Sequence, residues 1–259
     1  MTDLTPITFA ETDIDRIAGH SGRVAVFLEP EGRLDAGARR VNRLTKGALQ
    51  RLVESERFAA LKPGDMLSLG YPAGMAAEAV DVIHMPRRAD VMTARKAGAA
   101  LAKRRGDSDL LLLTAATRRV ADVAFGLAMR DYGFEDHKSA PKPRKGSVEV
   151  MCSKPEEARE AAAPLIAVAE GAFMTRDLTN APANILTTTN FAERLAEMES
   201  LGLVVEVLDE EELASLGMRT LLSVGQGSDS PSKVVVMRWD GGTDDAAPLA
   251  LVGKGVVFD

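Results

Sequence analysis

A lysine and an aspartate five positions apart are the residues with the clearest chemical potential. Lys254 lies between two glycines in the segment LVGKGVVFD (Leu251–Asp259), directly after an apolar run that predicts a buried strand. Glycines let the backbone approach a ligand closely, so the amine can contact a phosphate or, together with Asp259, ligate a metal ion. In a regular strand such positions point to opposite faces, and the two side chains converge only if the backbone turns near Gly255. The residues alone leave both options open.

Histidine and cysteine positions give little support for another catalytic or metal site. His20, His84 and His137 are far apart, and none has the spacing of a metal-ligand motif. His84 lies in an apolar run, which favours a structural role. Cys152 has only Lys154 as a basic neighbour, which is typical of an inert thiol. A single cysteine excludes a disulfide framework and a cysteine-built zinc site.

Two further motifs are compatible with ordinary loops. The segment GQGSDS (225–230) has serine where the third glycine of a dinucleotide fingerprint belongs, so we interpret it as a loop. The segment RDLTNAPANIL (Arg176–Leu186) places asparagine before a proline-containing turn, where its side chain can fix a tight backbone path. On spacing alone, this second motif is an interdomain turn.

Basic residues gather around one predicted helix. They favour either a phosphate-binding surface or a solvated helix face, and without interleaved aromatic residues we favour the solvated face. The cluster consists of Arg87, Arg88, Arg95, Lys96, Lys103, Arg104 and Arg105.

The elements that position these residues follow an alternating strand and helix pattern, which predicts an α/β fold with a largely parallel, covered sheet. In the first part, strands are predicted at Val24–Leu28, Met66–Leu69, Ala79–Met85, Asp109–Thr114 and Ser147–Cys152, and helices at Asp35–Glu54, Val91–Arg105 and Thr117–Arg130.

A long helix over Pro155–Leu178, with a kink expected at Pro164, is interpreted as the connection to a second α/β segment. In that segment, helices are predicted at Thr189–Leu201 and Asp209–Leu216, and strands at Leu203–Leu208, Leu221–Val224, Lys233–Trp239 and Leu249–Val252.

Composition supports two soluble units. Of the 259 residues, 46% are hydrophobic and 27% are charged, and no apolar run approaches the roughly 18 residues needed to span a bilayer. Residues 151–259 hold 8 Lys/Arg and 18 Asp/Glu, a net charge of −10, whereas residues 1–150 carry a net charge of +4. The N-terminus lacks the layout of a signal peptide. We therefore expect a cytoplasmic protein without membrane contact.

With these motifs the chain resembles the leucyl aminopeptidase family, also called cytosol aminopeptidases. The resemblance rests on RDLTNAPANIL, on SVGQGS (Ser223–Ser228) and above all on LVGKGVVFD. A looser match is GLAMRDYGFEDHKS (Gly126–Ser139), which has His137 where a tyrosine is usual.

The resemblance implies a division into three parts. Residues 1–154 would form a macro-domain-like N-terminal α/β domain, residues 155–177 a linking helix, and residues 178–259 the first part of an α/β dinuclear metallopeptidase domain. It also implies a homohexamer acting on peptides with a free N-terminus, with leucine-type preference.

The resemblance implies two divalent metal ions per subunit, Mn²⁺ or Zn²⁺, which activate a hydroxide. Lys254 matches a lysine that ligates one ion, and Asp259 matches an aspartate that bridges both. The other ligands, the catalytic lysine and an Asn-Thr-Asp-Ala-Glu-Gly-Arg motif are expected beyond Asp259, so no catalytic residue is expected within these 259 residues.

Two alternatives stay open beside the metalloaminopeptidase. The chain could be a non-catalytic fragment or assembly piece, or its basic N-terminal module could bind nucleic acid.

Overall fold

The computed structural model describes residues 2–141, 146–242 and 247–257. It divides into two compact units, unit 1 over Met1–Asp177 and unit 2 over Leu178–Asp259. Within the described residues, no helix is both long and apolar enough to cross a membrane.

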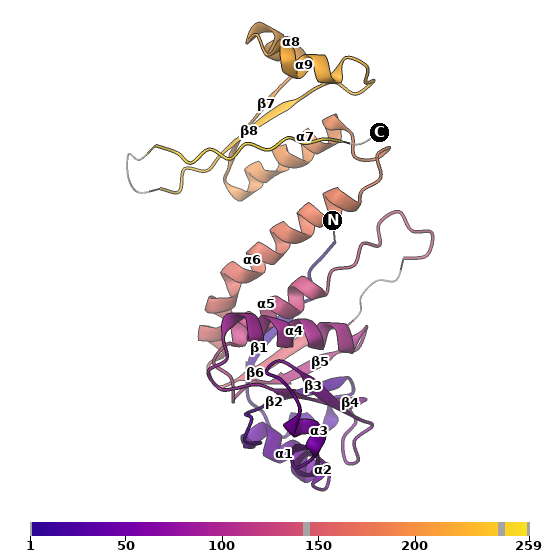
Figure 1. The fold of residues 1–259 in the computed structure, drawn as a ribbon, viewed down its shortest axis with the longest axis vertical. Helices are drawn as coiled ribbons and strands as arrows, with labels where there is room; N and C mark the ends of the chain where they lie inside the picture. The colour runs from indigo at the N-terminus through magenta and orange to yellow at the C-terminus, as the bar shows by residue number, and fades with distance from the viewer. Residues whose placement is uncertain (1, 142–145, 243–246, 258–259) are drawn as a thin grey trace. The chain divides into compact units, whose positions relative to one another are not determined.

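Unit 1 is built on a six-stranded sheet with the order β1-β6-β5-β2-β4-β3 (Figure 1). All neighbouring strands pair in parallel except β3, which runs antiparallel to β4 at the edge. The predicted α/β class with a largely parallel sheet is confirmed. The strands are β1 (Ile7–Glu11), β2 (Arg23–Leu28), β3 (Met66–Gly70), β4 (Ala79–His84), β5 (Leu110–Leu113) and β6 (Val148–Cys152).

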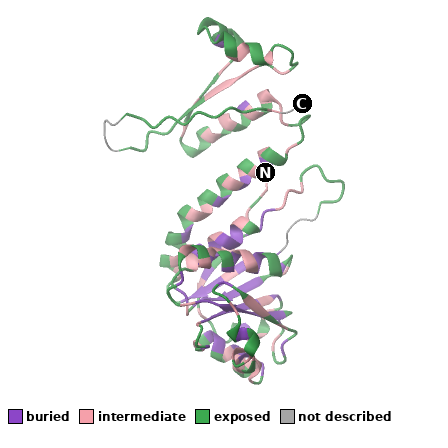
Figure 2. Ribbon diagram, viewed as in Figure 1, coloured by how far each residue is buried: buried purple, intermediate pink, exposed green. Residues whose placement is uncertain are grey.

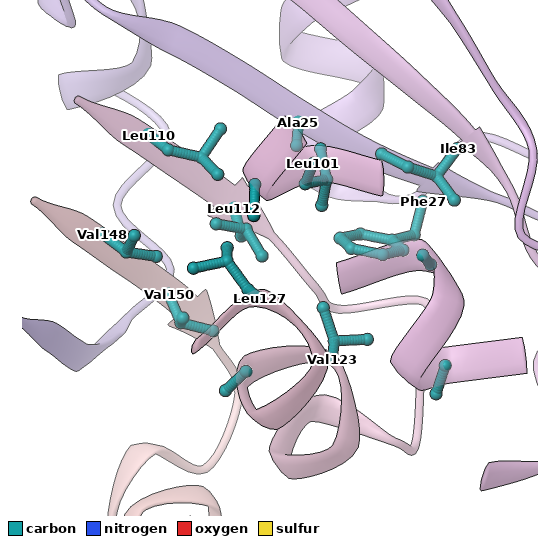
Figure 3. Close-up of a cluster of buried hydrophobic side chains, with 14 of the residues drawn as sticks. Ala25, Phe27, Ile83, Leu101, Leu110, Leu112, Val123, Leu127, Val148 and Val150 are labelled. Atoms are coloured by element: carbon teal, nitrogen blue, oxygen red, sulfur yellow. The ribbon is translucent and has the colours of Figure 1, made fainter. Parts of the chain in front are cut away.

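Helices cover both faces of this sheet, which explains why its central strands are apolar without alternation. One face packs against α4 (Val91–Arg105) and α5 (Val120–Arg130), as the side chains in Figure 3 show. The other face packs against the 3₁₀ helix η1 (Arg16–Gly19) and the helices α1 (Ala36–Leu44), α2 (Ala48–Val53) and α3 (Glu56–Ala59). Figure 2 shows the buried residues concentrated along the strands between these layers.

The single helix predicted over Asp35–Glu54 is wrong, because the structure divides this segment into α1 (Ala36–Leu44) and α2 (Ala48–Val53). Lys46 and Gly47 adopt positive φ values of 51° and 81° between them. The Gly47 N–H donates to the Asn42 carbonyl, a bond that closes the end of α1. The apolar spacing continues across the break, so periodicity alone did not reveal it. A short α3 (Glu56–Ala59) follows.

Helix α6 (Pro155–Asn180) is 26 residues long and runs unbroken through Pro164, which is exposed. Ala162, Ala169, Phe173 and Asp177 form its buried stripe within unit 1. Because these residues lie on one face of the helix, that face of α6 is the one buried in unit 1.

Unit 2 is built around a two-stranded antiparallel sheet of β7 and β8. Asp209 caps α8 in a capping box with Glu212, a local signal present in the sequence. The elements are α7 (Thr188–Ala196), the 3₁₀ helix η2 (Glu197–Leu201), β7 (Val204–Leu208), α8 (Glu210–Ser215), α9 (Arg219–Gly225) and β8 (Val234–Arg238).

Two strands predicted in this region are wrong. Leu221–Val224 lies inside α9, where the Leu222 N–H donates to the Met218 carbonyl at 3.2 Å. A four-residue segment with three apolar residues fits a helix turn as well as a strand. Leu249–Val252 forms no strand, and its Leu249, Leu251 and Val252 side chains are exposed. No described strand pairs with this run, and its apolar side chains are therefore not buried.

Candidate metal-binding segment

Lys254 lies in unit 2, in the described segment 247–257, which contains no helix or strand. Its side chain is exposed, so its amine is accessible to a ligand. Asp259 lies outside the described residues. The convergence of Lys254 and Asp259 on one metal centre therefore stays a prediction.

The donor chemistry of this segment fits a divalent ion only in part. An amine nitrogen and a carboxylate suit Zn²⁺, Mn²⁺ or Co²⁺, and Lys254 can supply one such ligand. Among the residues that the structure describes, no three His, Cys, Asp or Glu side chains gather as a metal-binding group. Lys254 thus needs ligands from outside the described part of the chain.

The ring of Phe191 lies close to the backbone immediately after Lys254. A Cβ atom built on Gly255 would lie 2.8 Å from Cε1 and 3.3 Å from Cδ1 of Phe191 on α7. The first of these distances is shorter than any real Cβ contact, so an L side chain fits only if the ring moves. Sequence reasoning related Gly255 to a backbone turn and missed this packing role.

The motif RDLTNAPANIL begins inside α6 and not in a turn, so its interpretation as an ordinary interdomain turn is corrected for Arg176–Asn180. The buried Asp177 carboxylate accepts hydrogen bonds from the Thr2 N–H at 2.6 Å, the Thr2 hydroxyl at 2.7 Å and the Tyr132 hydroxyl at 2.9 Å. The Arg176 guanidinium stacks over the Tyr132 ring at 3.8 Å and donates to the Met129 carbonyl. These contacts anchor the end of α6 within unit 1.

His84 and Cys152 lie in the structural surroundings that the sequence predicts for them. His84 ends β4 and is 7% exposed, with its ring edge-on to Phe58 at 5.4 Å. Cys152 is buried and free, and burial raises the pKa of its thiol. A raised pKa lowers the thiolate fraction and hence the reactivity.

The basic cluster separates into paired and unpaired members. Arg105 is buried and pairs with Asp131, and Arg95 pairs with Asp122 at 3.2 Å, so these two arginines stabilise unit 1. The remaining five are exposed and form no ion pair with the residues that the structure describes: Arg87, Arg88, Lys96, Lys103 and Arg104.

Unit 1 also has a cleft of about 420 Å³ that sequence reasoning missed. Arg16 and Glu149 line it and bind each other through two hydrogen bonds of 2.7 and 2.9 Å. Glu149 raises the pKa of Arg16 through this hydrogen-bonded ion pair. The two charges therefore satisfy each other, whereas His20, which also lines the cleft, has a buried Nε2 without a hydrogen-bond partner among the described residues.

The fold defines the class of the protein as α/β, with a largely parallel, covered sheet in unit 1 and a glycine-flanked lysine in unit 2. Residues 173–259 match the family model described as the cytosol aminopeptidase family, catalytic domain. The resemblance predicted from the sequence is therefore confirmed, and the chain contains part of that catalytic domain.

Similar proteins extend this match to the whole chain. Two relatives named "Probable cytosol aminopeptidase", from Cereibacter sphaeroides and Dinoroseobacter shibae, are 51% and 53% identical over 259 residues. These alignments cover 100% of this chain and 53% of each relative, so the chain spans about half the length of the curated relatives it matches.

Two solved structures are similar in fold. A mutant tomato leucine aminopeptidase matches with a TM-score of 0.73 and 18% identity over 91% of this chain and 51% of its own. The bottromycin maturation enzyme BotP, solved in complex with Mn, matches with a TM-score of 0.62 and 28% identity over 85% of this chain and 45% of its own.

Proposed function

We propose that this chain is part of a metal-dependent aminopeptidase that hydrolyses N-terminal residues, with leucine-type preference, from peptides with a free N-terminus. The observation that carries the proposal is LVGKGVVFD inside the matched catalytic-domain region, with an accessible amine at Lys254. The relatives named as aminopeptidases support the reaction, and the neighbour solved with Mn supports the use of a metal.

In this proposal Lys254 would be a ligand of one of two divalent ions, and Asp259 would be a ligand shared by both. When bound, such a pair supplies a hydroxide nucleophile and polarises the scissile carbonyl. Lys254 binds only through its unprotonated nitrogen, so it must release a proton as it ligates. The Asp259 carboxylate offsets part of the repulsion between the two cations.

The test is hydrolysis of leucine-p-nitroanilide by the protein at its full natural length, with Mn²⁺ and after chelation. Lys254→Ala is expected to lower activity by roughly 100-fold or more, since losing even supporting groups of a metal site costs 10–100-fold. Lys233→Ala, a second lysine of unit 2, is the control and should stay near wild type. If neither the chelator nor Lys254→Ala lowers the activity, the proposal is refuted.

The proposal extends to assembly and location. We infer a homohexamer, which the family resemblance implies, and a cytoplasmic location, in keeping with relatives named as cytosol aminopeptidases. Light scattering coupled to size-exclusion chromatography measures the assembly, and a monomer at working concentration would contradict it.

A second candidate function is binding of nucleic acid by unit 1. The five exposed cations on and beside α4 without ion-pair partners among the described residues favour it. Gel shifts across a salt series test it, because phosphate contacts weaken steeply as salt rises. No retardation at low salt removes this function.

A further inference from the structure

Unit 2 leaves most of its large apolar side chains exposed. Of the eighteen large apolar side chains that are exposed among the described residues, fourteen lie in this unit, although it is less than half as long as unit 1. Within the described part of unit 2, only Ala192 and Leu213 are buried apolar residues, whereas both clusters of buried apolar residues lie in unit 1. Figure 2 shows this difference from α7 onward. Unit 2 therefore has a large apolar surface and almost no core of its own.

Part of this surface belongs to the sheet of unit 2. Four of its apolar side chains are between 37% and 52% exposed: Val204, Val207, Val236 and Met237. The sheet has two strands among the described residues, so each strand has one edge without a described partner. A two-stranded sheet is marginally stable by itself, and further strands or a packed helix are needed to stabilise it. The sheet therefore has free edges and apolar side chains that are not covered.

The run Leu249–Val252 is exposed to an even greater extent. Leu249, Leu251 and Val252 are 87%, 88% and 97% exposed. The run follows β8 closely in the sequence, yet it pairs with no strand among the described residues, although each strand of unit 2 has a free edge. Contiguous apolar surface of this kind on a folded protein marks a place where another segment of chain packs. A strand at Leu249–Val252 therefore needs a partner from outside the described residues.

We propose that the residues that follow Asp259 in the protein at its full natural length cover this apolar surface, which consists of the four exposed side chains of β7 and β8 and the run Leu249–Val252. The same residues supply the strand that pairs with Leu249–Val252. The inference goes beyond the proposed function, because it holds whether or not Lys254 is a metal ligand.

Length and charge favour this occupant over a second copy of the chain. The alignments cover 53% of each of two curated relatives, so nearly as much chain again is available to cover the surface. Unit 2 lies within the region that matches the catalytic-domain model, so the covering residues would belong to the same domain. Residues 178–259 hold 5 Lys/Arg and 13 Asp/Glu, a net charge of −8, so two copies of unit 2 repel each other.

Hydrogen exchange of the protein at its full natural length, measured by mass spectrometry on peptides from residues 247–257, tests the proposal. The amides of Leu249–Val252 should exchange roughly 100-fold more slowly than those of an unstructured peptide of the same sequence, because the hydrogen bonds of a covered strand open rarely. Exchange at the rate of the unstructured peptide overturns the proposal. A dilution series identifies the cover: protection that persists supports the proposal, whereas protection that is lost as copies dissociate assigns the surface to a second copy and overturns it.

A matched pair of valine variants in the same full-length protein gives a second readout. Val252 is 97% exposed, and Val168, on α6 in unit 1, is 58% exposed. Val252→Ala should lower the urea midpoint of unfolding, because it leaves a cavity beneath the covering residues, whereas Val168→Ala should leave the midpoint nearly unchanged. Both changes are mild, and circular dichroism confirms that each variant is folded. If Val252→Ala lowers the midpoint no more than Val168→Ala does, the surface is not covered and the proposal is overturned.

Discussion

Replacing Gly98 with alanine should force helices α4 and α5 apart. The two helices cross at a pair of glycines, each facing the backbone of the other helix. A Cβ on Gly98 would lie 2.0 Å from the Val123 carbonyl oxygen, and a Cβ on Gly126 would lie 2.1 Å from the Arg95 carbonyl oxygen. Because the obstacle is helix backbone and not a flexible side chain, no rotamer change makes room.

The cost follows from the required displacement. Ordinary contact begins at 3.4 Å, so the helices must separate by more than an ångström at the crossing. A gap of that size forfeits a quarter to a half of the dispersion energy of the atoms beside it. Overpacking of this kind costs about 3 kcal/mol, and alanine regains about 1 kcal/mol of helix propensity. We expect Gly98→Ala and Gly126→Ala each to lose about 2 kcal/mol of unfolding free energy.

Thermal and urea unfolding followed by circular dichroism measure this loss, which corresponds to a fall of about 4–8 °C in Tm for a unit of this size. Gly171→Ala in α6 is the control, because a Cβ there meets nothing within 4 Å and should raise stability by about 0.5–1 kcal/mol. The double variant Gly98→Ala/Gly126→Ala should lose less than the sum, since the first separation relieves the second clash. If Gly98→Ala stabilises the protein as Gly171→Ala does, the crossing is not where the structure has it.

The remaining predictions concern four groups in unit 1. Burial raises the pKa of Asp35. The contribution of this carboxyl group to stability therefore declines as the pH rises from about 3.8 through the raised pKa. Asp35→Asn should remove this decline when the free energy of unfolding is measured with urea at several pH values. Asp90, whose pKa is lowered by the Thr93 N–H, should behave oppositely, and Asp90→Asn should remove a contribution that is present above about 3.8 and lost as the pH falls. Asp81→Ala should lower the free energy of unfolding, measured with urea, by about 3–5 kcal/mol, because it leaves the Arg23 guanidinium without its partner at 2.7 Å. The double variant Arg23→Met/Asp81→Leu, which removes both charges, should lose less, and an equal loss would contradict this cause. Cys152 should resist a thiol-specific reagent until the protein unfolds, because its thiol is buried with a raised pKa, and labelling at the rate of a free thiol would contradict this.

The elements that sequence reasoning placed well are those whose own residues carry the signal. β5 is a run of four leucines that is buried on both faces, and α4 begins after the capping Asp90 and ends before Gly106. In both cases local propensity, burial and end signals agree, and the predicted bounds match the structure within one or two residues. The α/β class follows from these elements because helices of this length between buried strands need a covered sheet.

The elements that were missed depend on partners far away in the sequence. β1 has only five residues, and it is a strand because it pairs in parallel with β6, from Ile7 beside Val148 to Glu11 beside Cys152. Nothing within its own five residues specifies that pairing. The break between α1 and α2 is a milder case, since Gly47 marks the end of α1 but the apolar spacing carries on past it.

The candidate site contains both a local signal that the sequence shows and a contact with a distant residue that it does not show. Lys254 was found from sequence because the motif LVGKGVVFD places it between two glycines, and glycine between apolar residues indicates close backbone approach. Sequence cannot show which neighbour makes that approach, and the structure gives a different answer for each side, open space at Gly253 and the Phe191 ring at Gly255. Glycine at position 255 therefore lies close to α7, while glycine at position 253 has no described neighbour within 4 Å of its missing Cβ, and two identical residues in a motif cannot show that difference.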